Sequence, residues 1–195
     1  NLPNYGVFDD KRNFTAGGMP GPVMLRGIKF GLPICEDIWQ ADVAECLQES
    51  GADILLALNA SPFDSAKSER RMSTAVARTV ETGLPLIYVN MVGGQDELVY
   101  DGASFALNAD GSLASHFPSF SETVLQVQLA KTAGHIKLNG QITPPDEGMQ
   151  ALYRGVMLGL RDYVHKNGFP GVVLGLSGGI DSALVAALAV DALGA

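Results

Sequence analysis

The chain has 195 residues, with 13 lysines and arginines against 21 acidic residues and a formal net charge of −8. A 47% hydrophobic fraction with 17% charged residues is typical of a folded globular protein and excludes extensive disorder. The acidic balance argues against a general DNA- or RNA-binding protein, and no stretch approaches the roughly 18 apolar residues of a membrane helix. Two cysteines cannot build a disulfide scaffold, so we expect a reducing, cytoplasmic compartment.

The first 90 residues alternate between strand and helix patterns. Short apolar runs at 27–34, 53–59 and 85–91 predict buried strands. Between them, apolar residues recur at helical spacing over about 41–50 and 67–82, and a glycine follows each run. This order of strands and helices predicts an α/β sheet covered by helices.

Strand patterns without helices follow. Residues 98–107 and 112–117 predict a hairpin around the turn Asn108-Ala109-Asp110-Gly111, and residues 124–129 alternate like one more strand. The polar, proline-containing stretch 132–148 breaks the pattern and predicts a domain boundary.

A second α/β unit is predicted after this boundary. Its elements are a helix at 148–165, a strand at 171–176, a glycine loop at 177–182 and an apolar helix at 183–193. We therefore expect a first domain over residues 1–138, a linker at 139–148, and the start of a second domain at 149–195.

Cys35 is the first candidate for chemistry. It lies in Pro33-Ile34-Cys35-Glu36-Asp37-Ile38-Trp39, between a predicted strand and a predicted helix, where open α/β sheets place reactive groups. Backbone amides at such a place can stabilise an anion, and the thiolate is the nucleophilic form of cysteine. Glu36 and Asp37 tend to raise the pKa of a neighbouring thiol, so we expect a lysine partner. The alternative is a buried structural cysteine, which is the role expected for Cys46 on an apolar helix face.

The second candidate is the loop Gly175-Leu176-Ser177-Gly178-Gly179-Ile180-Asp181-Ser182 between a predicted strand and a predicted helix. The glycines let the backbone approach a ligand, and hydroxyls with free helix amides offer donors to phosphate. Asp181 can cap the helix or meet a metal or pyrophosphate. The loop is neither a Walker A nor a dinucleotide-binding motif, and its alternative is an ordinary tight turn.

Other features are less specific. His116, His135 and His165 are scattered and do not predict a zinc site. The stretch Gly93-Gly94-Gln95-Asp96-Glu97 is either a binding loop or a solvated turn.

Four segments resemble the nitrilase-like amidase half of glutamine-dependent NAD⁺ synthetases. They are residues 2–10, 34–39, 59–63 and 88–102. The motif Ser177-Gly178-Gly179-Ile180-Asp181-Ser182 resembles the ATP pyrophosphatase loop in the ligase half of the same family. The resemblance therefore implies a nitrilase-like four-layer α-β-β-α sandwich, truncated at its N-terminal side, followed by the start of a Rossmann-like α/β ATP pyrophosphatase domain.

The family resemblance also implies a mechanism. Cys35 matches the nucleophile of a Cys-Glu-Lys triad that hydrolyses glutamine, and the ammonia passes through an internal tunnel. Residues matching those that hold glutamine are Tyr5, Glu36, Ser61 and Lys67. The ligase half uses ATP and Mg²⁺ to adenylate deamido-NAD⁺, and residues 175–182 match its ATP loop. Without the resemblance, Tyr5 and Glu36 could equally brace the fold, and Lys67 could be a surface charge.

The same resemblance places the triad Glu and Lys before Asn1 and most of the ligase half after Ala195. We therefore expect a fragment that has neither activity alone, derived from a homo-oligomeric parent protein. The alternatives are a stand-alone nitrilase-type carbon-nitrogen hydrolase and a non-catalytic interaction module.

Overall fold

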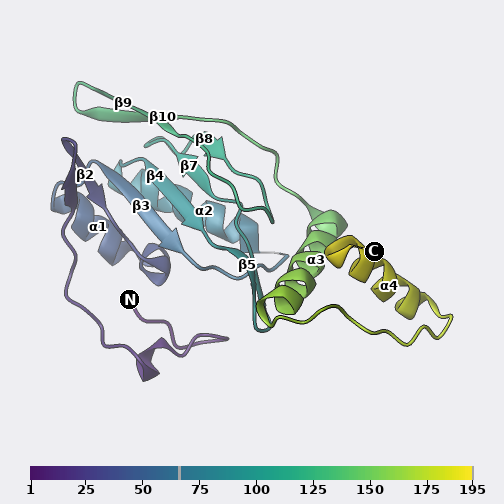
Figure 1. The fold of residues 1–195 in the computed structure, drawn as a ribbon. Coiled ribbons are helices and arrows are strands. Elements are labelled where there is room, and N and C mark those ends of the chain that lie inside the picture. The colour runs from purple at the N-terminus through teal and green to yellow at the C-terminus, as the bar shows by residue number, and fades with distance from the viewer. Residues whose placement is uncertain (66, 195) are drawn as a thin grey trace.

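The computed structural model describes residues 1–65 and 67–194, and of Lys67 and Ser68 only the backbone. Its centre is a six-stranded sheet with the strand order β1-β2-β3-β4-β7-β8 (Figure 1). The strands are β1 (Val23–Leu25), β2 (Ile28–Gly31), β3 (Ile54–Asn59), β4 (Leu86–Asn90), β7 (Phe105–Leu107) and β8 (Leu113–His116). Neighbours β2, β3 and β4 are parallel, and the outer pairs are antiparallel.

Two helices cover one face of the sheet. Helix α1 (Ala41–Glu49) follows β2, and helix α2 (Lys67–Thr82) follows β3, so each makes the crossover that parallel strands require. The core beneath them contains Leu47, Leu55 and Tyr88, all at most 1% exposed. The Tyr88 and Phe105 rings stack with their centroids 4.9 Å apart.

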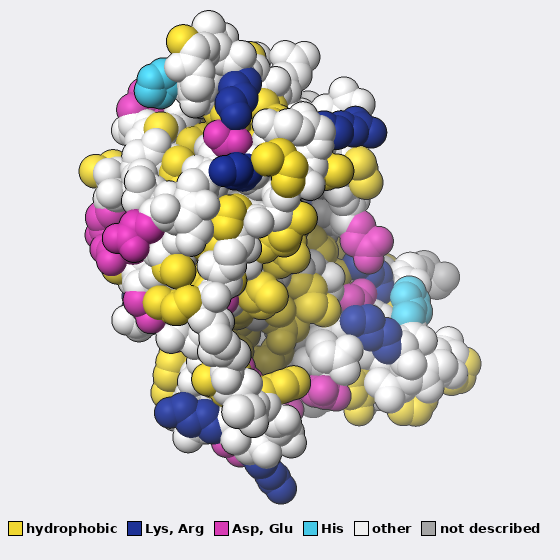
Figure 2. Space-filling view, turned by 90° about the vertical axis from the view of Figure 1, so that its left-hand side faces the viewer, with side chains coloured by type: hydrophobic (Ala, Val, Ile, Leu, Met, Phe, Trp, Pro, Cys, Tyr) yellow, Lys and Arg dark blue, Asp and Glu magenta, His cyan; other side chains and the backbone are white. Residues whose placement is uncertain are grey.

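The opposite face of the sheet is only partly covered. The hairpin of β9 (Gln128–Thr132) and β10 (His135–Asn139) packs Ile136 and Leu138 against it at one end. At the other end Leu58 and Val89 stay 45% and 40% exposed. A view of the surface shows hydrophobic side chains gathered in a hollow of the molecule (Figure 2).

A second hairpin joins the sheet to the C-terminal helices. It consists of β5 (Val92–Gln95) and β6 (Leu98–Asp101), and it packs against helix α3 (Gly148–Lys166). Helix α4 (Ile180–Leu193) in turn packs on α3, to one side of the sheet (Figure 1). Short 3₁₀ turns η1 (Asp10–Arg12) and η2 (Cys35–Ile38) complete the described elements.

The structure agrees with the predicted helices and the three central strands and differs elsewhere. Strands β1 and β5 lie where no strand was predicted. Residues 171–176 form no strand, since within the described chain no neighbouring strand offers them backbone partners. The hairpin predicted from residue 98 splits at Gly102, so that β6 pairs with β5 instead of β8. The strand predicted at 124–129 lies at Gln128–Thr132. Within the predicted boundary region, residues His135–Asn139 form strand β10, which pairs with β9.

Candidate active site

Cys35 lies on a strained turn at the carboxyl end of the parallel strands. Ile34 forms an isolated parallel bridge with Leu58, and the chain then leaves the sheet into η2. Cys35 has φ +47°, in the left-handed region, which a non-glycine residue occupies at a cost on the order of 1 kcal/mol. Strain of this kind concentrates at functional sites because the surrounding structure holds one side chain in a fixed place.

Asp37 holds this turn in place. Its backbone N–H donates to the Ile34 carbonyl at 3.0 Å, and its carboxylate accepts the Ile34 N–H, also at 3.0 Å. This reciprocal pair acts like a capping box at the start of η2. Asp37 therefore has a structural role beside Cys35.

Glu36, the other carboxylate beside Cys35, contacts Tyr5. The Tyr5 hydroxyl donates a hydrogen bond to Glu36 Oε2 at 2.8 Å. Burial, this hydrogen bond and the charges of Glu36 and Cys35 raise the pKa of Tyr5 to about 12. Tyr5 is therefore a neutral donor at neutral pH and keeps the Glu36 carboxylate oriented.

A cavity of about 540 Å³ opens beside Cys35. Three residues expected to hold glutamine, Tyr5, Glu36 and Ser61, line it together with Cys35. Ser61 is only 3% exposed and follows the end of β3. The structure therefore brings four of the five predicted residues to one cavity, while the side chain of Lys67 lies outside the described residues.

The cavity also contains residues that sequence reasoning did not select. They are Trp39, Phe63, Asp64, Arg70 and Leu98, among others. Arg70 and Asp64 supply opposite charges, which suits a ligand that carries both an ammonium and a carboxylate group. Only the position of Arg70 could have indicated a role in the site, because it lies in the first turn of α2, three residues after Lys67.

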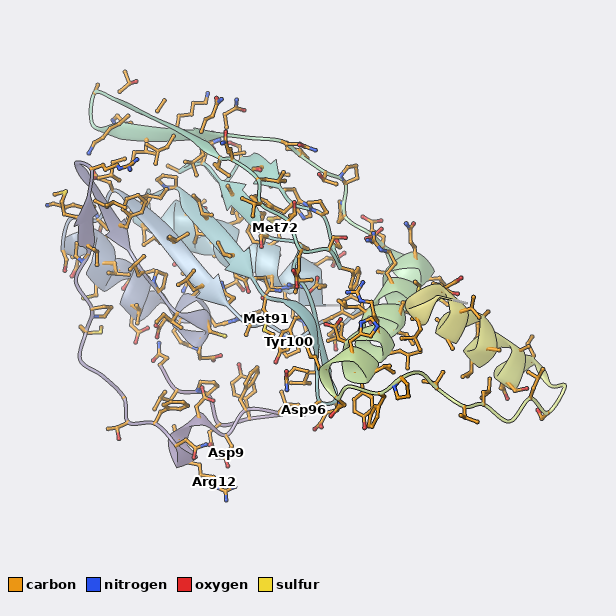
Figure 3. The ribbon with its side chains drawn as sticks, viewed as in Figure 1. Asp9, Arg12, Met72, Met91, Asp96 and Tyr100 are labelled. Carbon is orange, nitrogen blue, oxygen red and sulfur yellow. The ribbon has the colours of Figure 1, made fainter. Side chains whose placement is uncertain are left out.

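The hairpin β5–β6 forms part of this wall. Leu98 lines the cavity, and burial, with smaller contributions from the charges of Cys35 and Asp96, raises the pKa of Tyr100. Figure 3 shows Tyr100 on this hairpin and Asp96 at its tip. The stretch Gly93–Glu97 is thus a hairpin whose Gly94 N–H donates to Asp162 of α3 at 2.8 Å.

The glycine loop has donors that converge on the start of α4. Ser177 Oγ lies 3.0 Å from Ser182 Oγ, and the Gly179 N–H donates to Ser177 Oγ at 3.3 Å. Gly178 has φ +82°, a conformation that favours glycine. The loop is exposed, and no residue of it belongs to the described lining of the Cys35 cavity. The two candidate sites are therefore separate.

Two family models match the chain. The carbon-nitrogen hydrolase model matches residues 3–137. The chain belongs to the carbon-nitrogen hydrolase family. The NAD synthase model matches residues 152–195, on the C-terminal side of the carbon-nitrogen hydrolase region.

Relatives match the chain across both of these regions. The chain is 49% identical, over its whole length, to a glutamine-dependent NAD⁺ synthetase from Rhodobacter capsulatus, of which it covers 35%. A solved glutamine-dependent NAD⁺ synthetase from Acinetobacter baumannii, in complex with adenosine diphosphate, matches with TM-score 0.92 and 44% identity over 100% of this chain and 37% of that one. This carbon-nitrogen hydrolase chain thus spans about a third of these relatives' length.

The solved structure of an amidase is similar to the fold of the first part of the chain. A mutant of the amidase from Nesterenkonia sp. AN1, solved after Michael addition of acrylamide at the active-site cysteine, matches with TM-score 0.53 and 26% identity over 60% of this chain and 45% of that one. The nitrilase-like α/β fold predicted from the sequence, followed by the start of an NAD synthase domain, is confirmed.

The described part of this carbon-nitrogen hydrolase chain shows neither a metal-binding cluster nor a membrane-spanning helix. Among the described residues, no group of three or more His, Cys, Asp or Glu side chains is arranged to hold a metal ion. The helices in the described part of the chain are too short or too polar to cross a membrane.

Proposed function

We propose that this chain is part of a glutamine-dependent NAD⁺ synthetase. In this proposal glutamine is hydrolysed at Cys35, and the ammonia amidates deamido-NAD⁺ to NAD⁺ with ATP, releasing AMP and pyrophosphate. The observation that carries the proposal is the pairing, in one chain, of a cavity centred on a strained cysteine with a separate glycine loop. Proteins named glutamine-dependent NAD⁺ synthetases match this chain over its whole length, which includes both parts.

The first step takes place at the Cys35 sulfur. The thiolate attacks the carboxamide carbon of glutamine, the C–N bond breaks, and the nitrogen leaves as ammonia after gaining a proton. A water molecule then hydrolyses the glutamyl thioester to glutamate and free thiol. Glu36 and Arg70 are charged groups of the cavity that can bind the ammonium and carboxylate ends of glutamine, and Ser61 and Lys67 complete the proposed contacts.

The general base and the cation of the triad belong, in this proposal, to the part of the relatives' length that this chain does not span. A thiolate next to two carboxylates needs such a cation, because the nearby negative charges otherwise favour the neutral thiol.

The glycine loop suits the phosphates of ATP. Its serine hydroxyls, together with the amides at the start of α4, are hydrogen-bond donors on one exposed loop. Gly175, Leu176, Gly178 and Gly179 bring the backbone close, and Ile180, Asp181 and Ser182 form the first turn of the helix. Bound Mg²⁺ would neutralise phosphate charge, and Asp181 is the carboxylate of the loop that can approach it.

The organisation of the whole protein is proposed on the same basis. We assign residues 1–138 to the glutaminase domain, 139–148 to a linker and 149–195 to the start of the ligase domain. The full-length protein is expected to form homo-oligomers in the cytoplasm, where glutamine, ATP and deamido-NAD⁺ are its small-molecule partners.

Cys35→Ala in the full-length protein tests this division of labour. NAD⁺ formation is measured with glutamine and, separately, with ammonium chloride as the nitrogen source. We expect loss of the glutamine-driven rate and an unchanged ammonia-driven rate, and Cys46→Ala as the matched control should retain both. Loss of both rates in Cys35→Ala would contradict the proposal, and so would a retained glutamine-driven rate.

A further inference from the structure

Four buried polar residues form a connected group that includes Ser61, which lines the Cys35 cavity. They come from separate elements: Ser61 follows β3, Asn90 ends β4, Asp101 ends β6 and Arg71 lies in α2. Their exposed fractions are 3%, 6%, 3% and 3%, respectively. Burying so many polar groups is costly unless they satisfy one another, so their contacts decide what they do.

The Asn90 side chain continues the sheet beyond its last strand pair. The β3–β4 ladder ends with Asn59 opposite Asn90. Beyond that pair, Asn90 Oδ1 accepts the Ser61 N–H at 2.9 Å, and Asn90 Nδ2 donates to the Ser61 carbonyl at 3.3 Å. An amide that accepts and donates in this way replaces a peptide group of a neighbouring strand, and it fixes the backbone of Ser61.

Asp101 supports the orientation of this amide that the Ser61 backbone requires. Asn90 Nδ2 lies 3.4 Å from Asp101 Oδ1, and an ionised carboxylate accepts hydrogen bonds but cannot donate them. The NH₂ group therefore faces both the Ser61 carbonyl and Asp101, the orientation that also places Oδ1 against the Ser61 N–H. Arg71 Nη2 donates to the other carboxylate oxygen at 2.6 Å and balances its charge.

We propose that Asp101 is a positioning residue for glutamine: acting through Asn90, it holds Ser61 in place on the wall of the Cys35 cavity. The inference rests on the proposed function, because it assigns Ser61 to glutamine binding. The same carboxylate anchors α2 through Arg71, four residues after Lys67 at the start of that helix. One buried carboxylate thus fixes two of the segments expected to contact the substrate.

Asp101→Asn in the full-length protein tests the proposal. The variant keeps the shape of the side chain but loses its charge, so the hydrogen bond from Asn90 Nδ2 becomes a weaker, neutral one and Asn90 holds Ser61 less firmly. We expect the KM for glutamine to rise about tenfold, the effect of roughly one hydrogen bond, while kcat changes less than about twofold. Ammonia-driven NAD⁺ formation, measured in parallel, should be unchanged. Asp110→Asn, an exposed aspartate between β7 and β8, is the matched control and should leave the KM unchanged.

Asn90→Ala provides a second variant that keeps the Arg71–Asp101 ion pair. If Asp101 acts through Asn90, the KM of the double variant Asp101→Asn/Asn90→Ala equals that of Asn90→Ala alone. Independent, multiplying effects would overturn the proposal. An unchanged KM in Asp101→Asn would also overturn it, as would an equal fall of the glutamine- and ammonia-driven rates, which indicates a purely structural role.

A crystal structure of Asp101→Asn separates this inference from the proposed function. If the wild-type protein uses ammonia but never glutamine, the proposed function fails. The crystal structure of the variant still shows whether Asp101 holds Ser61 in place. The inference predicts that at least one of the two Ser61–Asn90 hydrogen bonds is lengthened or broken in the variant. An unchanged Ser61 with both hydrogen bonds to Asn90 intact would overturn it.

Discussion

The Tyr5 hydroxyl donates a hydrogen bond to Glu36 Oε2 at 2.8 Å, across 31 positions of the chain and directly beside Cys35. This contact links the N-terminal segment to the turn that carries the thiol. It also gives one oxygen of the Glu36 carboxylate a hydrogen-bond donor. Since the pKa of Tyr5 is raised to about 12, with burial as the largest cause, the donor stays neutral across the working pH range.

Tyr5→Phe should weaken glutamine binding in the full-length protein. The substitution removes only the hydroxyl, so Glu36 loses its orienting donor, and we expect the glutamine KM to rise roughly three- to tenfold. The ammonia-driven rate should not change. Tyr163→Phe, an exposed tyrosine on α3, is the control. An alkaline limb near pH 10 in the wild-type glutamine-driven rate that disappears in Tyr5→Phe would contradict the raised pKa of Tyr5.

The backbone at Cys35 should reveal its strain when the side chain is removed. At φ +47° glycine is less strained than alanine, so we expect Cys35→Gly to unfold at a higher urea concentration than Cys35→Ala, by about 1 kcal/mol in stability. At Cys46, inside helix α1, the order should reverse by a similar amount. Equal stability of the two Cys35 variants would show that the turn is not strained.

His116 should make the folded state sensitive to acid. It is 8% exposed, and burial lowers its pKa below the ordinary value of 6.5. As pH falls through about 6.5 the unfolded chain gains a proton that the folded chain binds less readily, so stability falls. In His116→Gln the free energy of unfolding, measured with urea, should therefore decrease less between pH 7 and pH 5 than in the wild type. The exposed His135→Gln should behave as wild type, and an identical profile for His116→Gln would refute the assignment.

The close contact between the β5–β6 hairpin and α3 leaves no room for a side chain at Gly94. A Cβ there would lie 3.0 Å from the Gly159 Cα and 3.2 Å from the Asp162 Cβ. Because a backbone atom must move, we expect Gly94→Ala to destabilise the protein by about 1–3 kcal/mol in thermal unfolding. At Gly171 a Cβ would meet nothing within 4 Å, and Gly171→Ala should be close to neutral. Equal melting temperatures for the two variants would mean that α3 does not pack here.

The sequence predicted the parts of the fold whose patterns are local. The apolar runs became β3 and β4, and the helical spacings became α1, α2 and α3 almost at their predicted bounds. The segment 171–176 shows the limit of such patterns, because an apolar run forms a strand only where a neighbouring strand can pair with it. The β5–β6 hairpin was missed for a different reason. Its two glycines resembled a loop, but they are where the hairpin approaches α3.

The candidate site was likewise predicted only in part. The family motifs selected Cys35, Tyr5, Glu36 and Ser61, and the structure places them on one cavity. Nothing in the sequence indicated that Asn90 would continue the sheet or that Asp101 would meet Arg71, since these contacts join residues about 30 positions apart. Such contacts depend on how β4, β6 and α2 pack, which no single segment encodes.

Mass spectrometry of the acid-quenched full-length protein with glutamine tests the central claim most directly. Acid stops hydrolysis, so a thioester formed during turnover stays on the chain. We predict one glutamyl group on the peptide that contains Cys35, absent in Cys35→Ala and absent from the Cys46 peptide. A glutamyl group on Cys46, or glutamine turnover that continues in Cys35→Ala, would contradict the assignment of Cys35 as the nucleophile.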